Sequence, residues 1–241
     1  MNERMEILRQ QGRALVTGAS RGIGYAVAER LSDAGFSVIA VGRRFEPDAF
    51  AGRPDVEKVV FDLTRCDALA GLVEGLGPIS VLINNAGVMN PNTWKDYPEE
   101  ARARSLHVNL VAPVELMRLC APGMLAAGGG AIVNVASIAG YIGHSDHWYG
   151  ATKAGLLNVT KTFALQLGAG GVTVNAVAPG PVETDMLAMI PPERRAMLRN
   201  NAVTGRFATP AEVADAVLTM AFGPLQITGA TLDVCAGAVL R

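Results

Sequence analysis

Cysteine, aromatic residues and clustered positive charge are all scarce in this sequence of 241 residues. Its three cysteines, Cys66, Cys120 and Cys235, are odd in number and widely spaced, which argues against a disulfide framework and against a zinc site of the C-x-x-C type. We interpret them as small apolar residues of a protein in a reducing cytoplasm. The formal net charge is -1 and lysine and arginine form no dense run, so the basic footprint of a nucleic-acid-binding protein is missing.

Long apolar runs and a secretion signal are missing as well. No stretch reaches the roughly 18 uninterrupted apolar residues that a membrane-spanning helix requires. The first residues are rich in charge, and no apolar region follows them as it does in a signal peptide. We therefore expect a soluble, cytoplasmic protein without a membrane partner, whose ligands are small molecules.

Half of the residues are hydrophobic, and short β-rich runs recur with helical segments between them. Strands that alternate with helices pair in parallel through right-handed crossovers. We therefore expect an α/β fold of the Rossmann type: a doubly wound, seven-stranded, mainly parallel sheet with helices on both faces, in a single domain over residues 1–241. The expected strands are residues 13–17, 37–42, 56–62, 79–83, 130–136, 172–178 and 230–235.

Two segments depart from this regular alternation. Residues 97–127 have a helical pattern but contain Pro113 and Pro122, and proline interrupts helical hydrogen bonding. Residues 183–208 form an insertion with methionines, prolines and arginines between a strand and the next helix. We interpret this insertion as a substrate lid, and an ordinary surface helix and loop is the alternative.

A glycine-rich segment follows the first expected strand and opens a helical pattern. Glycines permit a tight turn and a close approach of the backbone to a pyrophosphate, and the N-terminus of the helix favours negative charge. The segment therefore predicts a nucleotide-phosphate site, although such a cluster can also mark only a turn. The candidate residues are Gly18, Ser20, Arg21, Gly22, Ile23 and Gly24.

The end of the second expected strand carries Arg43 and Arg44 where an NAD-specific site would place an acid on the adenosine ribose. With Arg21 they can provide forked cationic donors for a 2′-phosphate. The arginines favour NADPH/NADP as the cofactor; a solvated surface cluster is the alternative.

Three further residues suit acid–base chemistry. Tyr149 and Lys153 are four residues apart, which places them on one face of a helix, where the ammonium can lower the pKa of the phenol. Ser137, at the end of the preceding strand, can donate a hydrogen bond to a substrate oxygen on which charge develops.

Together these segments resemble the short-chain dehydrogenase/reductase family from about Gly12 to the C-terminus. The resemblance implies that Tyr149 donates the proton in reduction, that Ser137 positions the carbonyl, and that Lys153 partners both the tyrosine and the nicotinamide ribose, with Asn109 completing the set. It also implies that Asp62 and Leu63 lie at the adenine and that Val182 and Thr184 contact the nicotinamide amide. The remaining cofactor-binding residues that it implies are Asn85, Ala86, Gly87, Tyr149, Lys153, Pro179 and Gly180.

Pro113 lies four residues after Asn109 and has no N–H to offer to its backbone carbonyl. We hypothesise that this carbonyl holds a water that relays protons with Lys153 to Tyr149.

Three functions are open at this stage. The leading one is reduction of a ketone or β-ketoacyl group, because residues 175–180 and 205–213 look similar to bacterial 3-oxoacyl carrier-protein reductases. A secondary-alcohol dehydrogenase of specialised metabolism is the alternative among enzymes. A catalytically silent NADPH-binding sensor or scaffold is the alternative outside them.

Partners and neighbours of the site are less constrained. A carrier-bound substrate would favour a basic patch, for which Arg102, Arg104, Arg194, Arg195 and Arg199 are candidates. His144 and His147 are open to a substrate contact or a plain surface position, and no third ligand indicates a metal. The resemblance suggests a homotetramer or homodimer packed through residues 106–125 and 148–168.

Overall fold

The computed structural model describes residues 3–90 and 94–239. Within them seven strands form one sheet in the order β3-β2-β1-β4-β5-β6-β7, and every neighbouring pair is parallel. The strands are β1 (Arg13–Thr17), β2 (Val38–Gly42), β3 (Val56–Val60), β4 (Ile79–Asn84), β5 (Gly130–Val135), β6 (Val172–Pro179) and β7 (Thr231–Val234). The expected doubly wound α/β fold is confirmed.

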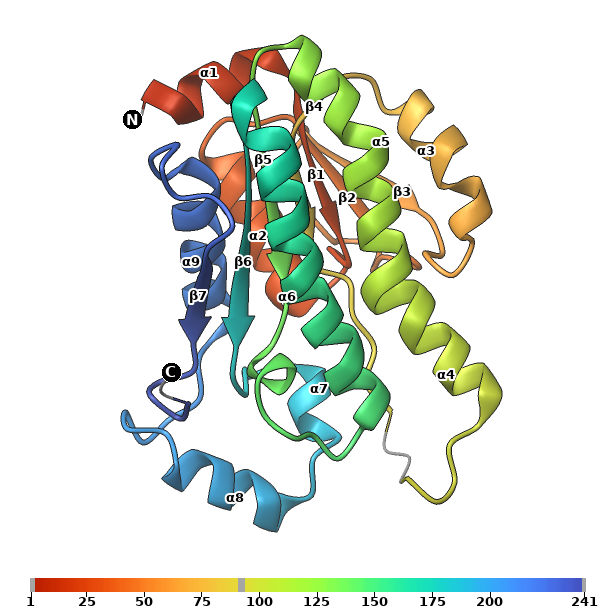
Figure 1. The fold of residues 1–241 in the computed structure, drawn as a ribbon, viewed down its shortest axis with the longest axis vertical. Coiled ribbons are helices and arrows are strands. Elements are labelled where there is room, and N and C mark those ends of the chain that lie inside the picture. Colours follow the sequence, from red (N-terminus) through yellow and green to blue (C-terminus); the bar gives the residue numbers. More distant parts are fainter. Residues whose placement is uncertain (1–2, 91–93, 240–241) are drawn as a thin grey trace.

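Helices cover both faces of this sheet (Figure 1). On one face α2 (Gly22–Asp33) and α9 (Pro210–Phe222) pack against a buried cluster that includes Ala14 and Val16. On the other face α3 (Leu69–Gly75), α5 (Ala112–Ala126) and α6 (His147–Leu167) pack against a cluster that includes Leu15. Successive strand residues point to opposite faces, so a strand buried on both sides is apolar at every position.

The N-terminal segment forms α1 (Glu3–Gln11), an element that the sequence pattern did not predict. Arg4 anchors this helix, because its guanidinium donates to the carbonyls of Gly223 and Gly130 at 2.7 and 3.1 Å and to Oγ1 of Thr173 at 2.5 Å. These acceptors lie at or beside the amino ends of strands, away from the edge where the strands end. Few apolar residues in α1 explain why its sequence carries little helical signal.

The segment with two prolines is helical from Glu99 to Ala126. It comprises α4 (Glu99–Leu106), the π-helical turn η2 (His107–Val111) and α5, in which Pro113 lies in the first turn and Pro122 in the interior. The backbone N–H of Ala112 donates to the carbonyl of His107, five residues earlier. The first turn of a helix tolerates proline, so Pro113 accompanies a wider turn instead of a break.

By length and hydropathy alone, the helical run Glu99–Ala126 could cross a membrane. Half of its most apolar window is buried, and Leu116, Met117 and Met124 of α5 pack into the core. A buried core helix passes the same test, and the packing identifies this run as one.

The remaining elements are short. They are the 3-10 turns η1 (Cys66–Ala68), η3 (Ile138–Gly140) and η4 (Gly168–Gly170), and the helices α7 (Asp185–Ala188) and α8 (Pro192–Asn200). The last two lie in the insertion 183–208, beyond the carboxyl end of β6 (Figure 1). A bridge from Val182 to Ala208 joins the two ends of this insertion.

Candidate active site

The turn between β1 and α2 is shaped by its glycines. Gly18 has a φ of +65°, and a Cβ there would lie 2.8 Å from the Cα of Ala86, so the conformation and the space both require glycine. A Cβ at Gly24 would lie 2.4 Å from the carbonyl oxygen of Gly18. Helix α2 begins at Gly22, and the side chain of Arg21 does not cap it. Its first N–H groups therefore point into an open cradle that suits an anion.

Asn85 fastens this turn to the loop after β4. Its Nδ2 donates to the carbonyls of Thr17 and Gly18 at 2.9 and 3.2 Å. In return, Oγ1 of Thr17 accepts from the backbone N–H groups of Asn85 and Ala86 at 3.0 and 3.1 Å. The two loops at the carboxyl ends of β1 and β4 thus form one rigid unit. Ile23 packs against the adjoining core, whereas Ser20 lies beside Gly42 at the end of β2.

Arg43 and Arg44 follow β2 and are exposed. Asp62 lies beyond the end of β3, where a hydrogen bond from the backbone N–H of Thr64 lowers its pKa and the charges of Arg43 and Arg104 add to that effect. Arg104 of α4 therefore faces this corner too, a position that the strand pattern could not indicate. Leu63 beside it is buried. The guanidinium of Arg21 instead forms an exposed ion pair with Asp185 of α7, at 2.8 Å.

Ser137, Tyr149 and Lys153 come together where β5 ends and α6 begins. Ser137 caps η3, its Oγ accepting from the N–H of Ala139 at 3.1 Å and donating to the carbonyl of Pro179 at 3.5 Å, and Ser137 is close enough to Tyr149 to act on the pKa of the phenol. The Nζ of Lys153 donates to the carbonyl of Val135 at 2.7 Å and lies 5.8 Å from the centre of the Tyr149 ring. All three side chains are buried.

Burial controls the acidity of this cluster. It raises the pKa of Tyr149, against a smaller lowering by the hydrogen bond from Ser137, and the charge of Asp146 raises that pKa further. Burial also lowers the pKa of Lys153 to about 8. The expectation that Lys153 lowers the pKa of Tyr149 is not met, because removal of the phenol from water outweighs the stabilisation of its anion.

Asn109 lies in the π-helical turn and packs behind the loop after β4. Its Oδ1 accepts from the N–H of Val88 at 2.8 Å, and its Nδ2 donates to the carbonyl of Val88 at 2.9 Å and to Oγ1 of Thr152 at 3.2 Å. A Cβ at Gly87 would lie 3.5 Å from the Nζ of Lys153 and 3.7 Å from the Oδ1 of Asn109. Asn109 and Lys153 therefore border the same point on this loop.

The segment after β6 closes the site on its remaining side. Pro179 ends β6, and the N–H of Gly180 donates to the carbonyl of Val234 at 3.0 Å. Val182 is buried, and the side chain of Thr184 would lie 3.3 Å from a Cβ at Gly22. The predicted residues of this segment thus lie next to the glycine-rich turn.

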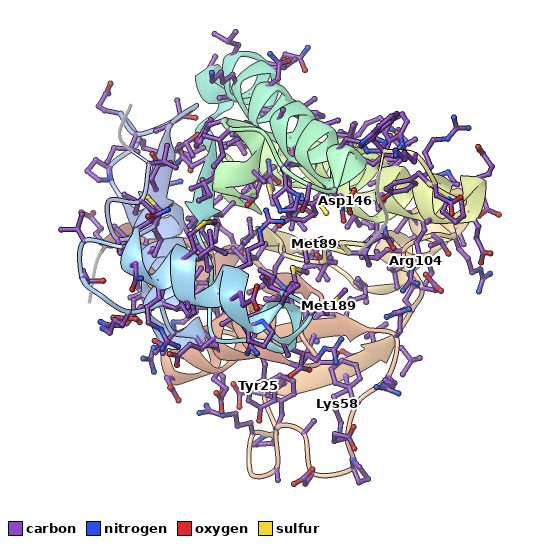
Figure 2. All side chains as sticks on the ribbon, turned by 90° about the horizontal axis from the view of Figure 1, so that it is seen from below. Tyr25, Lys58, Met89, Arg104, Asp146 and Met189 are labelled. Carbon is purple, nitrogen blue, oxygen red and sulfur yellow. The ribbon has the colours of Figure 1, made fainter. Side chains whose placement is uncertain are left out.

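Figure 2 looks along the molecule from the side of α7 and α8, with Met89, Asp146 and Met189 near the centre of the view and Arg104 to the right. Sequence reasoning missed Asp146, which caps α6 three residues before Tyr149. An aspartate immediately before a helical pattern was the available signal. His144 and His147 lie beside the site, their rings 5.1 Å from the Tyr149 ring and 4.9 Å from the Tyr97 ring. Among the described residues, no group of three or more metal-ligating side chains is clustered.

The residues predicted from the sequence thus lie at one edge of the sheet. Comparison with known proteins identifies the family of the chain. The short chain dehydrogenase family matches residues 13–195. The chain is 34% identical to the 3-oxoacyl-[acyl-carrier-protein] reductase of Vibrio cholerae over 93% of this chain and 96% of that one. It is 37% identical to the L-xylulose reductase of Bos taurus over 95% and 98%.

Among solved structures, an Agrobacterium tumefaciens protein assigned as a 2-deoxy-D-gluconate 3-dehydrogenase, with bound NADP, superimposes with a TM-score of 0.88 at 30% identity. The superposition covers 97% of this chain and 99% of that one. The sequence match and the fold agree, and the chain belongs to the short chain dehydrogenase family.

Proposed function

We propose that this protein reduces a ketone or β-ketoacyl group to a secondary alcohol, or catalyses the reverse reaction, with NADPH/NADP as cofactor. The observation that carries the proposal is the meeting of Ser137, Tyr149 and Lys153 in one buried cluster at the edge of the sheet that also holds the glycine-rich turn. Nicotinamide supplies or accepts the hydride, and the chain supplies the proton and the orientation.

The residues present fit a dinucleotide. Gly18 and Gly22 have positive φ, and a Cβ at Gly18 or Gly24 would clash with neighbouring protein atoms, so the tight turn requires glycine. A glycine turn of this kind at the N-terminus of a helix supports close approach of a pyrophosphate to the backbone. Arg43 and Arg44 suit a 2′-phosphate, and the related structure with bound NADP supports this choice. The other predicted residues, from Asn85 to Gly87 and from Pro179 to Thr184, would border the nicotinamide half.

Tyr149 is the proton donor in this proposal. The phenol carries its proton at neutral pH, as donation to a carbonyl oxygen that gains charge requires. Ser137 positions that oxygen by a second hydrogen bond. Lys153 borders the tyrosine on one side and Gly87 on the other, so it can hold the cofactor ribose while it orients the phenol. Asn109 fixes the loop that carries Gly87.

The relatives support the proposed substrate class. We propose that the insertion 183–208 is the substrate lid. Among the contacts of the lid, Asp185 pairs with Arg21, and Arg194 donates to Oγ of Ser145 at 3.0 Å. Arg194 is one of the predicted basic residues, and its contact with the loop before α6 supports a role in meeting an anionic substrate or carrier. A secondary-alcohol dehydrogenase of specialised metabolism is the second candidate, favoured by the exposed apolar Met189 of the lid.

We further propose that residues 1–241 form one domain and that the protein is a cytoplasmic homotetramer or homodimer. Leu165 on α6 is 87% exposed, which suits a helix face that a second copy covers. Cys66, Cys120 and Cys235 are free, in keeping with a reducing compartment.

A titration of the purified protein with NADPH and with NADH tests the cofactor. Oxidation assays with an acetoacetyl thioester, cyclic and aromatic ketones and a ketose then test the reaction. Tight NADPH binding with turnover of any of these substrates supports the proposal. Binding without oxidation across the whole panel favours the silent sensor or scaffold. A preference for NADH contradicts the proposal that Arg43 and Arg44 bind a 2′-phosphate.

A further inference from the structure

A buried carboxylate next to the catalytic tyrosine has no part in the function described so far. Asp146 is 1% exposed and is the N-cap of α6, with its Oδ1 accepting from the N–H of Tyr149 at 3.0 Å. A serine or asparagine would cap a helix equally well, and burial of a carboxylate is costly unless it is well hydrogen-bonded. A buried aspartate therefore needs a second reason.

The carboxylate of Asp146 also accepts hydrogen bonds from two other segments of the chain. Its Oδ2 accepts from the N–H of Asn90 at 2.7 Å, and its Oδ1 also accepts from the Tyr97 hydroxyl at 3.0 Å. The Nδ2 of Asn90 in turn donates to the Tyr97 hydroxyl at 3.0 Å and to Oγ of Ser105 at 2.9 Å. One side chain thus links α6, the loop that continues from Asn85–Gly87, and α4 through Ser105. Three donors on one carboxylate form a satisfied buried network, which is rigid because every member has a partner.

We propose that Asp146 is a positioning residue, which clamps the first turn of α6 to the loop after β4 and so holds the Tyr149 phenol in register with Ser137 and with the cofactor-binding loop. The inference rests on the proposed function, since it assigns Asp146 a part in that same reaction. The contacts explain the choice of residue: aspartate has two acceptor oxygens for three donors, whereas asparagine has one acceptor oxygen and an amide that would face a donor.

The charge of Asp146 has a second consequence. Its field raises the pKa of Tyr149. The other titratable groups near Asp146 and Tyr149 are Tyr97 before α4, His144 before α6, and His147 and Lys153 on α6. Removal of the negative charge therefore lowers the pKa of Tyr149. In the reductive direction the protonated phenol is the active form, so the alkaline limb of the pH profile moves to lower pH.

The test compares Asp146→Asn and Asp146→Ser with Thr209→Ala. Thr209 is the N-cap of α9, and its Oγ1 accepts from the N–H of Glu212 at 3.2 Å, so its loss removes a comparable cap that is not part of the Asp146 network. Asp146→Ser keeps a cap acceptor but cannot reach Asn90. We expect both Asp146 variants to bind NADPH as the wild type does, to lose about tenfold or more in kcat, and to shift the alkaline limb down by about half a pH unit or more. Thr209→Ala changes only the stability.

Tyr97→Phe removes one donor of the network while the ring stays, and we expect a smaller loss of kcat in the same direction. A titration of tyrosinate absorbance, taken as the difference between each protein and its Tyr149→Phe counterpart, reports the acidity of Tyr149 without any substrate. The titration therefore tests the role of Asp146 independently of the proposed function. A wild type that oxidises no NADPH would contradict the proposed function, and the titration would still test Asp146. Asp146 variants whose kcat and tyrosinate titration match those of Thr209→Ala would overturn the proposal.

Discussion

The Nζ of Lys153 lies 5.8 Å from the centre of the Tyr149 ring, and its hydrogen bond goes to the carbonyl of Val135. The two buried groups therefore sit side by side while burial moves both toward their neutral forms: the pKa of the phenol rises and that of the ammonium falls to about 8. A charge on either group is costly in this cluster, which makes the stability of the protein dependent on pH.

Lys153→Met should reveal this cost as a pH-dependent difference in stability. The pKa of Lys153 is about 8 in the folded protein and 10.5 ordinarily, so between these values the unfolded chain binds more protons and wild-type stability rises with pH. Below pH 8 the charged lysine costs about 3 kcal/mol. Urea unfolding at several pH values should show the wild type gaining on Lys153→Met from pH 8 upward. Lys161→Met, an exposed change on the same helix, should give no such trend, and parallel curves for all three proteins would contradict the prediction.

Tyr149→Phe should abolish turnover while NADPH still binds, since only the hydroxyl is lost. General acid catalysis contributes about 10²–10⁴-fold, so kcat should fall at least that far.

Ser137→Ala should lower kcat by about 10²-fold, because one donor to the developing negative charge disappears. Single-turnover oxidation of NADPH measures both. Comparable rates in Tyr149→Phe and the wild type would remove Tyr149 from the mechanism.

Arg43→Asp should weaken NADPH binding by about tenfold or more, because a charge-assisted hydrogen bond to a phosphate is replaced by repulsion. NADH binding should change little, since NADH has no 2′-phosphate. Fluorescence titration of both cofactors gives the ratio. Arg30→Gln is the matched control, because Arg30 on α2 pairs with Asp215 instead. Equal losses for NADPH and NADH would show that Arg43 does not read the 2′-phosphate.

Asp185→Ala should increase NADPH affinity severalfold, since Arg21 loses its ion-pair partner on α7 and becomes available to a phosphate. Both side chains of the pair are exposed, so the melting temperature should stay within about a degree of the wild-type value. The gain should shrink in high salt, which screens exposed charges. An affinity that is unchanged at low salt would mean that the pair does not compete with the cofactor.

Much of the site could be predicted because its chemistry is local. The glycine-rich turn, the end of β2 and the spacing of Tyr149 and Lys153 each lie within one short segment, where backbone conformation and helix periodicity follow from neighbouring residues. The strand limits held to within two residues. Two differences from the sequence prediction are small. Strand β3, an edge strand with exposed Glu57 and Lys58, ends at Val60, two residues before the predicted end. Helix α1 was not predicted because it has too few apolar residues to show a pattern.

By itself the sequence determined the order of strands and helices, the glycine-rich turn and the chemical identity of the candidate reacting groups, because these depend on local conformation and on side-chain type. Only the tertiary structure decided that Arg21 meets Asp185, that Arg104 faces Asp62, and that Asp146 joins Asn90 to Tyr149. It also reversed the expected shift of Tyr149. Each of these depends on which distant segments meet and on how much water they exclude, and desolvation is a property of the packed interior that no stretch of sequence contains.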